Sequence, residues 1–262
     1  KTLEENAHFI HLYSLAYRHF NKESYRKTAL LTYSFITEKL CSRNGGFIGS
    51  TTLTTSSEDS NYYQYSLNEL MLMFPGRYMD IALALGIDIT GNKFDKQIPV
   101  RNARTYSIIQ DEEIKILKER RSEHLGYYTD KREVTSYISQ LVESLAISSV
   151  LLNEPSLYKE AAAIMEYLLV HNRNENGRLY RYNCCQKSSI PGYLSDYSDL
   201  IAALIELHKA SGEENSDFKI YAGKYIDFVL KHFYKPENGM FSKSECSILP
   251  DTIPFKRESN ID

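Results

Sequence analysis

Two carboxylates stand near the starts of apolar segments, and paired carboxylates are a common catalytic device. Asp130 precedes the apolar segment 134–152, and Asp196 lies near the beginning of the segment 193–207. Two carboxyl groups on either side of a glycosidic bond can act as acid and base, so this pair is the catalytic candidate. The same positions also suit helix capping, because carboxylates favour the free N–H groups and the positive dipole of a first turn. The sequence leaves both interpretations open.

Two histidines give a weaker signal for a metal site. His8 and His11 are three residues apart in the segment 3–20, so they would lie close together on a helix. No clear third ligand accompanies them, and the chain has no His-Glu-x-x-His pattern. We therefore expect buried, hydrogen-bonded histidines and no metal site. Walker A, GxSxG and dinucleotide-binding patterns are also missing from the sequence, so no cofactor is predicted.

The cysteines bear on reactivity and on the compartment. Cys184 and Cys185 are adjacent, which disfavours a bridge between them, and a reactive thiol there would need a nearby cation to lower its pKa. Arg181 and Lys187 are close in sequence, but packing is the simpler interpretation. None of the four cysteines forms a CxxC motif, and there is no Asn-x-Ser/Thr sequon. These features favour an intracellular, reducing compartment, either the cytoplasm or an organelle, while the even number of cysteines leaves disulfides open.

Composition excludes some classes of partner. The chain has 262 residues, a net charge of −3 and 42% hydrophobic residues, which is ordinary for a globular protein. Its basic residues are dispersed rather than gathered into the basic face that nucleic acid requires, so no nucleic-acid partner is predicted. No apolar run approaches the roughly 18 residues of a membrane span, so no membrane partner is predicted either.

Three stretches of the chain read like copies of one another. They cover residues 25–47, 158–179 and 218–241. Each begins with an aromatic residue, continues as an amphipathic helix and reaches Asn-Gly, one further residue, and then Phe or Leu. A recurring unit is the signature of a repeat architecture. We expect the glycine of each Asn-Gly step to end the helix in a left-handed conformation.

An apolar segment precedes each copy and completes a helical hairpin. Residues 3–20, 134–152 and 193–207 are apolar on nearly all sides, which predicts helices buried within the protein. Short connections to the amphipathic helices predict antiparallel pairs. The predicted fold is all-α, an α/α-toroid of hairpins with short β pieces, in a single domain over 1–262. The hairpins cover about 3–42, 133–173 and 193–235.

An irregular insertion of about 46–130 interrupts this rhythm. The Ser/Thr-rich segment 50–61 predicts a loop, and 62–65 is compatible with a short strand. Residues 67–74 and 76–85 predict short helices. The strongly charged segment 111–123 predicts a helix with a solvated face.

The order of several motifs resembles a known family. The motifs are Lys1-x-Leu3-x-x-Asn6-Ala7, Asn44-Gly45-Gly46-Phe47, Tyr62-Tyr63, Gly91-Asn92-x-Phe94, Arg120-Arg121, Asp130-Lys131 and Gly192-Tyr193-Leu194-Ser195-Asp196-Tyr197. Together they resemble the YyaL-type family, which includes the spermatogenesis-associated thioredoxin-like proteins. The helical domain of that family is similar to N-acylglucosamine 2-epimerases and six-hairpin glycosidases.

The resemblance implies a role and a site. It implies an (α/α)6 barrel of which this chain holds three hairpins, preceded in the whole protein by a thioredoxin-like domain that is absent here. It implies a carbohydrate ligand held over the inner-helix ends, with hydrolase-like or epimerase-like chemistry. The expected substrate-binding residues are Asn6, Tyr63, Lys131 and Tyr197.

The chain departs from the family pattern in two segments, of which the second would face the barrel centre. Thr51 to Ser56 replace an acidic stretch, and Thr135 to Ser139 replace a segment with Trp-Asn-Gly. These departures favour the alternative function, a non-catalytic binding or scaffold domain that has kept the toroid. Fold alone does not decide between the two, because function depends on the residues of the site.

Overall fold

The computed structural model describes residues 2–42, 45–53, 63–100, 108–123, 127–184, 190–212 and 216–244. Some sequence features discussed above lie outside these residues: Asn44, most of the loop 50–61, Tyr62, Cys185, Cys246 and the C-terminal residues 245–262. The chain divides into two compact units. The first comprises 1–50 and 130–262, and the second comprises 51–129.

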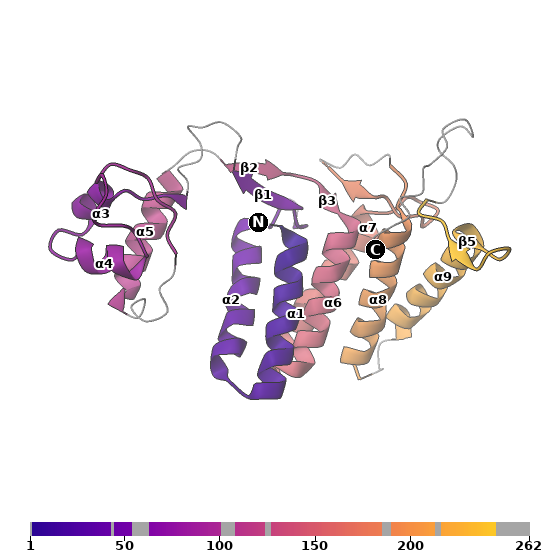
Figure 1. Cartoon of the computed structure of the whole chain (residues 1–262). Coiled ribbons are helices and arrows are strands. Elements are labelled where there is room, and N and C mark those ends of the chain that lie inside the picture. The colour runs from indigo at the N-terminus through magenta and orange to yellow at the C-terminus, as the bar shows by residue number, and fades with distance from the viewer. Residues whose placement is uncertain are drawn as a thin grey trace. The chain divides into compact units, whose positions relative to one another are not determined.

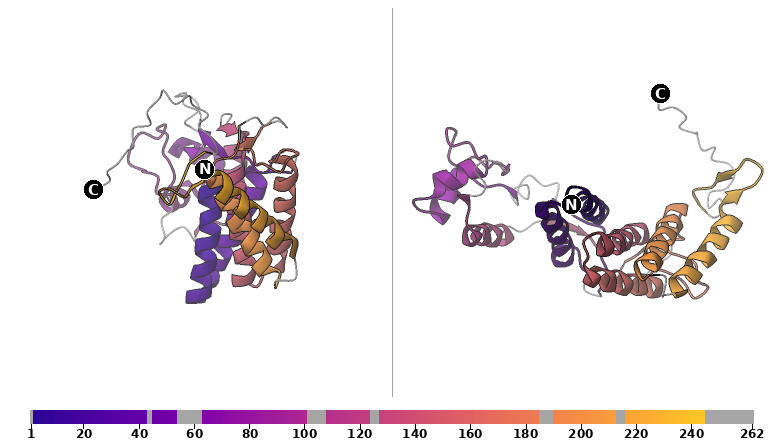
Figure 2. Two further views of the ribbon diagram at one scale, coloured as in Figure 1. Left: turned by 90° about the vertical axis from the view of Figure 1, so that its right-hand side faces the viewer. Right: turned by 90° about the horizontal axis from the view of Figure 1, so that it is seen from below.

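The described part of the first unit consists of three αα-hairpins (Figure 1). Their helices are α1 (Leu3–Phe20) with α2 (Glu23–Lys39), α6 (Thr135–Leu151) with α7 (Pro155–His171), and α8 (Leu194–Ala210) with α9 (Ser216–His232). Helices α1, α6 and α8 form an inner row with α6 at its centre, and α2, α7 and α9 each cover their hairpin partner. Figure 2 shows the helices of this unit nearly end-on in its right-hand view. The predicted all-α hairpin fold is confirmed.

Local sequence signals explain where several helices begin and end. Thr2 caps α1, since its hydroxyl accepts a hydrogen bond from the backbone N–H of Glu5 at 3.2 Å. The helix ends at Asn21, whose φ of 49° is the left-handed conformation that asparagine tolerates. Pro155 occupies the first position of α7, where its missing N–H costs nothing. Short turns between such ends bring each hairpin partner back antiparallel.

The core of the first unit lies between the two helix layers. Ile138, Leu141 and Leu145 of α6 are fully buried. The prediction that every inner helix is buried on all sides is wrong for α1, because Leu12 is 55% exposed and Leu15 is 47% exposed. Helix α1 stands at the end of the inner row and packs mainly against α2 and α6. Its position in the row, rather than its composition, leaves one apolar side open.

Each Asn-Gly step lies beyond its helix, which corrects a prediction from the sequence. The outer helices end at Lys39, His171 and His232, several residues before Gly45, Gly177 and Gly239. The glycines do adopt the predicted positive φ, at 88°, 79° and 68°. They sit in the turns of small antiparallel β-structures: the bridges Cys41–Phe47 and Arg173–Leu179, and the strands β5 (Tyr234–Lys235) and β6 (Met240–Phe241). A tight β-turn, not a helix end, therefore requires the glycine.

The described residues contain two further pairs of short strands. Strand β1 (Ser50–Leu53) pairs with β2 (Tyr127–Asp130), so residues 50–53 form a strand and not part of the predicted loop. Strand β3 (Glu133–Val134) pairs antiparallel with β4 (Tyr182–Asn183). Strand β3 leads directly into α6, so its pairing with β4 holds the beginning of α6 beside the chain that approaches α8. Among the described residues, no helix is both long and apolar enough to cross a membrane.

The second unit has its own small core. Helices α3 (Leu67–Met73), α4 (Tyr78–Ala84) and α5 (Asp111–Glu123) match the predicted helices. Leu70, Ile81 and Leu117 belong to its buried cluster. Ser66 and Glu69 form a capping box at the start of α3, which satisfies two backbone N–H groups.

A glycine near the inner-helix ends provides a test of packing in this region. A Cβ atom on Gly46 would lie 2.5 Å from Tyr167 Cε1 and 2.7 Å from Glu133 Cδ. Gly46→Ala is therefore expected to lower the free energy of unfolding by about 1–3 kcal/mol, the usual cost of overpacking. Gly223 in α9 has open space around it, so Gly223→Ala should raise stability by about 0.5–1 kcal/mol. Urea denaturation of both variants measures the contrast, and equal effects would contradict the packing described here.

Candidate functional site

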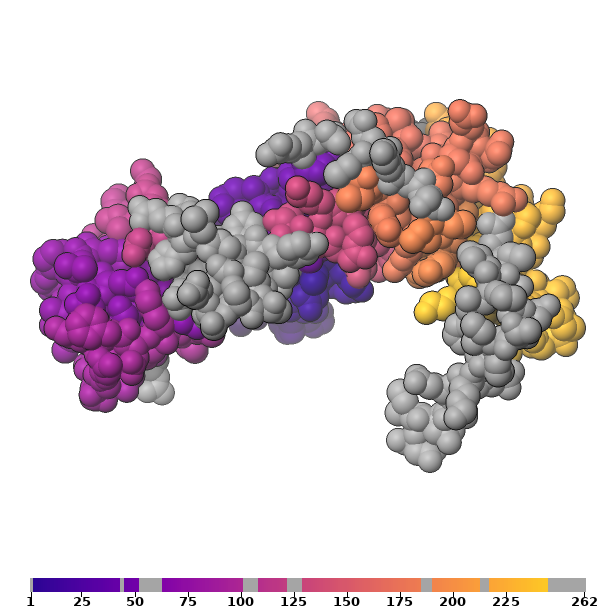
Figure 3. All heavy atoms as spheres, turned by 90° about the horizontal axis from the view of Figure 1, so that it is seen from above, coloured from indigo at the N-terminus to yellow at the C-terminus, as the bar shows by residue number. Residues whose placement is uncertain are grey.

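A cavity of about 320 Å³ lies at the end of the first unit where the inner helices begin. The helices α1, α6 and α8 all start at this end, the upper end in Figure 1, which is the end that Figure 3 views. The walls include Thr2 before α1, Tyr137 in α6 and Tyr193 before α8. The remaining lining residues come from the strand segments and turns between the helices: Gly49, Ser50, Asp130, Arg132, Val134, Arg181, Tyr182 and Ile190.

Asp130 faces this cavity in a close pair with Arg132. The guanidinium Nε of Arg132 lies 2.9 Å from Asp130 Oδ1, and its Nη2 lies 2.6 Å from Oδ2. The backbone N–H of Arg132 also donates to Oδ1, at 3.1 Å. These hydrogen bonds lower the pKa of Asp130, with the Arg132 side chain as the largest cause. Asp130 is therefore an ionised acceptor at neutral pH and has no proton to donate.

A second arginine–aspartate pair lies behind the cavity wall. Arg181 Nη1 lies 2.7 Å from Asp196 Oδ1, and Asp196 is fully buried. Asp196 also accepts hydrogen bonds from the backbone N–H groups of Tyr193, at 2.7 Å, and Ser136, at 3.2 Å. Burial raises the pKa of Asp196 to about 6, although Arg181 and the backbone donors oppose that change. Asp196 therefore ties the start of α8 to the start of α6.

Each of the two arginines also lies over a tyrosine ring of the cavity wall. The guanidinium carbon of Arg132 is 5.6 Å from the centre of the Tyr182 ring, and that of Arg181 is 5.2 Å from the centre of the Tyr193 ring. Both distances are within the range of cation–π attraction. The cavity thus combines aromatic faces, guanidinium donors and one ionised carboxylate, which can stack on a ring and hydrogen-bond to hydroxyl groups.

The structure separates the two carboxylates of the predicted catalytic pair. Asp130 lines the cavity, whereas Asp196 is buried and serves as the helix cap that was its alternative interpretation. Asp196 reaches the cavity only through Arg181. A carboxylate without exposed surface cannot touch a substrate, so Asp196 has no direct chemical role in this site. It holds Arg181, which lines the cavity, in position.

The four predicted substrate-binding residues lie in different surroundings. Asn6 is half-buried, and its amide donates to the backbone carbonyl of Thr2 at 2.6 Å. Lys131 is exposed beside the cavity residues Asp130 and Arg132 in sequence. Tyr63 belongs to the second unit, where Arg121 lies 5.6 Å from its ring centre.

Tyr197 is a core residue in this structure. Its ring is 1% exposed and stacks on Phe228 with ring centres 5.0 Å apart. Its hydroxyl accepts a hydrogen bond from the backbone N–H of Leu179 at 3.0 Å. These contacts join α8 to α9 and to the turn after α7, and they leave no surface for a ligand. Tyr197 was expected to bind substrate, and its burial in the core excludes it from the site described here.

Sequence reasoning missed the two arginines and their tyrosine partners. The one signal in the sequence was the run Tyr180-Arg181-Tyr182, an arginine between two aromatic residues, of which Arg181 and Tyr182 both line the cavity. Arg181 was considered only as a cation near Cys184. Its partner, Asp196, lies 15 residues further along the chain, and only the fold shows that Arg181 reaches it at the start of α8.

The two histidines of α1 also differ from expectation. His8 is exposed rather than buried, and His11 is half-buried. Burial and the neighbouring His8 lower the pKa of His11, so it is neutral at physiological pH. Within the described residues, no group of three or more His, Cys, Asp or Glu side chains is arranged to hold a metal ion.

A further polar group lies where α6 faces α8. Asp199 accepts hydrogen bonds from Ser136 Oγ at 2.5 Å and from Gln140 Nε2 at 3.0 Å. Burial raises the pKa of Glu143, and the nearby carboxylates of Glu206 and Asp199 add to that rise. These contacts explain Asp199 as a structural acceptor between two inner helices.

Comparison with known proteins shows the fold. No protein-family model matches the sequence, and no curated protein matches it. Cellobiose 2-epimerase from Bacillus thermoamylovorans B4167 is structurally similar, with a TM-score of 0.57 and 12% identity over 92% of this chain. The chain spans 47%, about half, of the length of that epimerase. At this identity the similarity assigns the hairpin toroid fold and nothing finer.

Two other solved structures match with lower scores. A D-mannose isomerase has a TM-score of 0.40 and 12% identity, over 93% of this chain and 79% of its own. An unsaturated glucuronyl hydrolase from Bacillus sp. GL1 has a TM-score of 0.38 and 15% identity, over 89% of this chain and 64% of its own. The fold assignment rests on the epimerase alone.

Proposed function

We propose that the first unit is a carbohydrate-binding part of an α/α-toroid and that a sugar occupies the cavity at the inner-helix starts. The observation that carries this proposal is the set of groups around one cavity: two arginine–tyrosine pairs and the ionised Asp130. Tyrosine faces suit the apolar faces of sugar rings, and a carboxylate accepts hydrogen bonds from paired hydroxyl groups. The toroid fold shared with a cellobiose 2-epimerase supports the same ligand class by analogy.

Binding without two-carboxylate hydrolysis is the version that the geometry favours. Among the described residues that line the cavity, Asp130 is the one carboxylate, and Arg132 already holds both of its oxygens. Acid–base hydrolysis needs a second carboxyl group on the other side of the bond. Thr135 and Ser139 do not supply new chemistry there, because their hydroxyls donate to the backbone carbonyls of Tyr180 and Thr135.

Hydrolase-like or epimerase-like processing is the alternative function. It is favoured by the likeness in fold to a carbohydrate epimerase and by the resemblance to the YyaL-type family. In that version Asp130 is the residue that would act on the substrate, as a base, because its lowered pKa keeps it deprotonated. The resemblance also carries the proposal that a whole protein of this kind includes a thioredoxin-like domain.

The test is sugar binding by the full chain and by the variant Asp130→Asn. Calorimetric titration with a panel of monosaccharides and disaccharides should detect binding by the unmodified chain. We expect Asp130→Asn to weaken that binding by about 10-fold or more, since a hydrogen bond to a charged group contributes about 1.5–3 kcal/mol. Asp227→Asn, which changes an exposed aspartate on α9, is the matched control and should bind normally.

Two results would contradict the proposal. One is the absence of binding for every sugar in the panel. The other is equal binding by Asp130→Asn and the unmodified chain, provided that thermal denaturation shows the variant to be folded. Incubation of a bound disaccharide followed by product analysis then separates the two versions, because binding alone leaves the sugar unchanged.

A further inference from the structure

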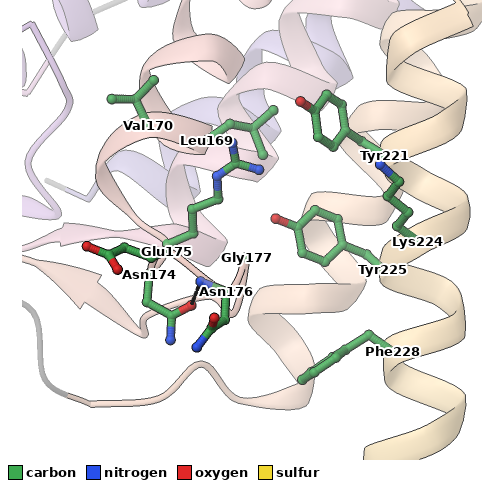
Figure 4. A pocket seen from close by; sticks show the side chains of 11 residues that line it. Leu169, Val170, Asn174, Glu175, Asn176, Gly177, Tyr221, Lys224, Tyr225 and Phe228 are labelled. Carbon is green, nitrogen blue, oxygen red and sulfur yellow. Dashed lines mark hydrogen bonds between the residues drawn. The ribbon is translucent and has the colours of Figure 1, made fainter.

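A larger cavity of about 670 Å³ opens between the outer helices α7 and α9. It shares no lining residue with the cavity at the inner-helix starts. One wall is the end of α7 with the turn that follows it, and the other wall is one face of α9 (Figure 4). Nothing in the proposed carbohydrate function uses these residues, so the cavity needs an explanation of its own.

The α9 wall is aromatic. Tyr221, Tyr225 and Phe228 lie three and four residues apart, which places them on one face of the helix. Figure 4 shows their side chains projecting from α9 toward the turn that contains Asn174, Glu175 and Asn176. Tyr221 and Phe228 are partly exposed, so their rings offer apolar surface to a ring-shaped ligand.

Two cations flank the same aromatic surface. The guanidinium carbon of Arg173 lies 5.7 Å from the centre of the Tyr221 ring, and Lys224 Nζ lies 5.6 Å from it. No carboxylate of the described residues is within ion-pairing distance of either cation. Glu175 is the acidic residue in the wall, and it is exposed. The lining therefore carries more positive than negative charge, which favours an anion.

Tyr225 adds a buried hydroxyl whose proton has no acceptor. The residue is only 6% exposed, and no described residue accepts a hydrogen bond from its hydroxyl. A buried donor without an acceptor is costly, and such groups are rare in folded proteins. Burial raises the pKa of Tyr225, and a hydrogen-bonding interaction with the Arg173 side chain opposes the rise. A guanidinium only donates, so the hydroxyl keeps its own proton and can donate it to an acceptor.

We propose that the cavity between α7 and α9 binds a small organic anion that carries its acidic group on a ring. The ring lies against Tyr221 and Phe228, and the phosphate or carboxylate group lies between Arg173 and Lys224. The hydroxyl of Tyr225 donates a hydrogen bond to that group and so gains the acceptor that it lacks. This site is separate from the proposed sugar cavity, and neither depends on the other.

Calorimetric titration of the full chain with phenyl phosphate tests the proposal. Inorganic phosphate and phenol are the companion probes, since each retains one half of the recognised chemistry. We expect phenyl phosphate to bind more tightly than either companion and to bind more weakly at higher salt. The proposal would be overturned if phenyl phosphate gave no heat of binding at concentrations up to about 10 mM, since a dissociation constant above that value is very weak binding.

Matched variants locate the bound anion. Lys224→Gln should weaken phenyl phosphate binding by about 5-fold or more, whereas Lys231→Gln, an exposed lysine of α9 outside the cavity, should leave it unchanged. Arg132→Gln should also leave it unchanged. If Arg132→Gln abolishes binding and Lys224→Gln does not, the anion occupies the inner-helix cavity and the proposal is wrong.

Tyr225→Phe provides a readout that a purely structural tyrosine would not give. Loss of the hydroxyl should weaken phenyl phosphate binding by about 3- to 10-fold, as expected for one hydrogen bond. The thermal midpoint of the ligand-free variant should equal or exceed that of the unmodified chain, because the variant no longer buries a hydroxyl proton without an acceptor. Unchanged affinity in Tyr225→Phe would exclude the hydroxyl from the site, and a lowered midpoint would show that it already has a structural partner.

Discussion

Asp196→Ala is expected to lower the free energy of unfolding by about 3 kcal/mol at pH 7. The substitution breaks an ion pair whose carboxylate is fully buried, and it leaves the Arg181 guanidinium, which is about one quarter exposed, without its partner. It also leaves the backbone N–H groups of Tyr193 and Ser136 without their acceptor. Urea denaturation measures the loss. A loss below about 1 kcal/mol would show that water replaces these bonds and that the pair has no structural role.

The pH dependence of stability gives an independent test of Asp196. Its pKa is raised from 3.8 to about 6 in the folded chain, so the folded chain binds this proton more tightly than the unfolded chain does. The stabilisation from the protonated form is fully present below about pH 4 and is lost as the pH rises to about 6. The full shift corresponds to about 3 kcal/mol.

Asp196→Asn isolates this contribution from that of other groups. The amide cannot titrate, so the fall in unfolding free energy between about pH 4 and pH 6 should be smaller in this variant than in the unmodified chain. Asp130→Asn should change the pH profile with the opposite sign. The lowered pKa of Asp130 stabilises the fold at higher pH, and that stabilisation is lost as the pH falls. Without the carboxylate, the unfolding free energy should therefore fall less as the pH is lowered. Parallel profiles for the unmodified chain and Asp196→Asn would contradict the raised pKa.

Leu141→Ala is expected to lower the free energy of unfolding by about 2–5 kcal/mol, the range for deletion of a buried leucine side chain. Leu141 is fully buried in α6, the central helix of the inner row, which packs against α1, α7 and α8. Helices on three sides restrict how far the surroundings can relax into the space that is left. The cost should therefore lie in the upper half of the range.

Leu31→Ala is the matched control for this substitution. Leu31 lies in the outer helix α2 and is 59% exposed, so its removal should cost less than about 1 kcal/mol. Thermal or urea denaturation of the two variants under one condition gives the comparison. Similar losses for both would contradict the central position of α6 in the core.

The local elements were predictable to a large extent. Residues 3–20 were predicted as a helix and α1 has the same bounds, and the predicted charged helix 111–123 is α5. Apolar periodicity and charge act over a few turns of one helix, so they are readable from one segment. The Asn-Gly steps show the limit of such local reasoning. Their glycines adopt the predicted left-handed conformation, but pairing with the residues before the turn makes each step a β-turn rather than a helix end.

The sequence pattern also predicted that α1 is buried on all sides, whereas in the structure one of its apolar sides is exposed. Composition cannot distinguish a helix flanked on both sides from one at the end of a row. The candidate site shows the same limit. Asp130 and Asp196 looked equivalent as polar residues near inner-helix starts, yet one lines a cavity and the other is buried in a cap.

The sequence by itself determined the all-α class, the pairing of apolar and amphipathic helices into hairpins, and the left-handed conformation of three glycines. These features follow from periodicity and from backbone preferences, which act between residues close in the chain. Only the tertiary structure decided which polar groups meet: Arg181 with Asp196, Arg132 with Tyr182, and Arg173 with Tyr221. Burial and charge pairing are set by neighbours that the fold brings together, so neither the cavity at the inner-helix starts nor the one between α7 and α9 can be read from one segment alone.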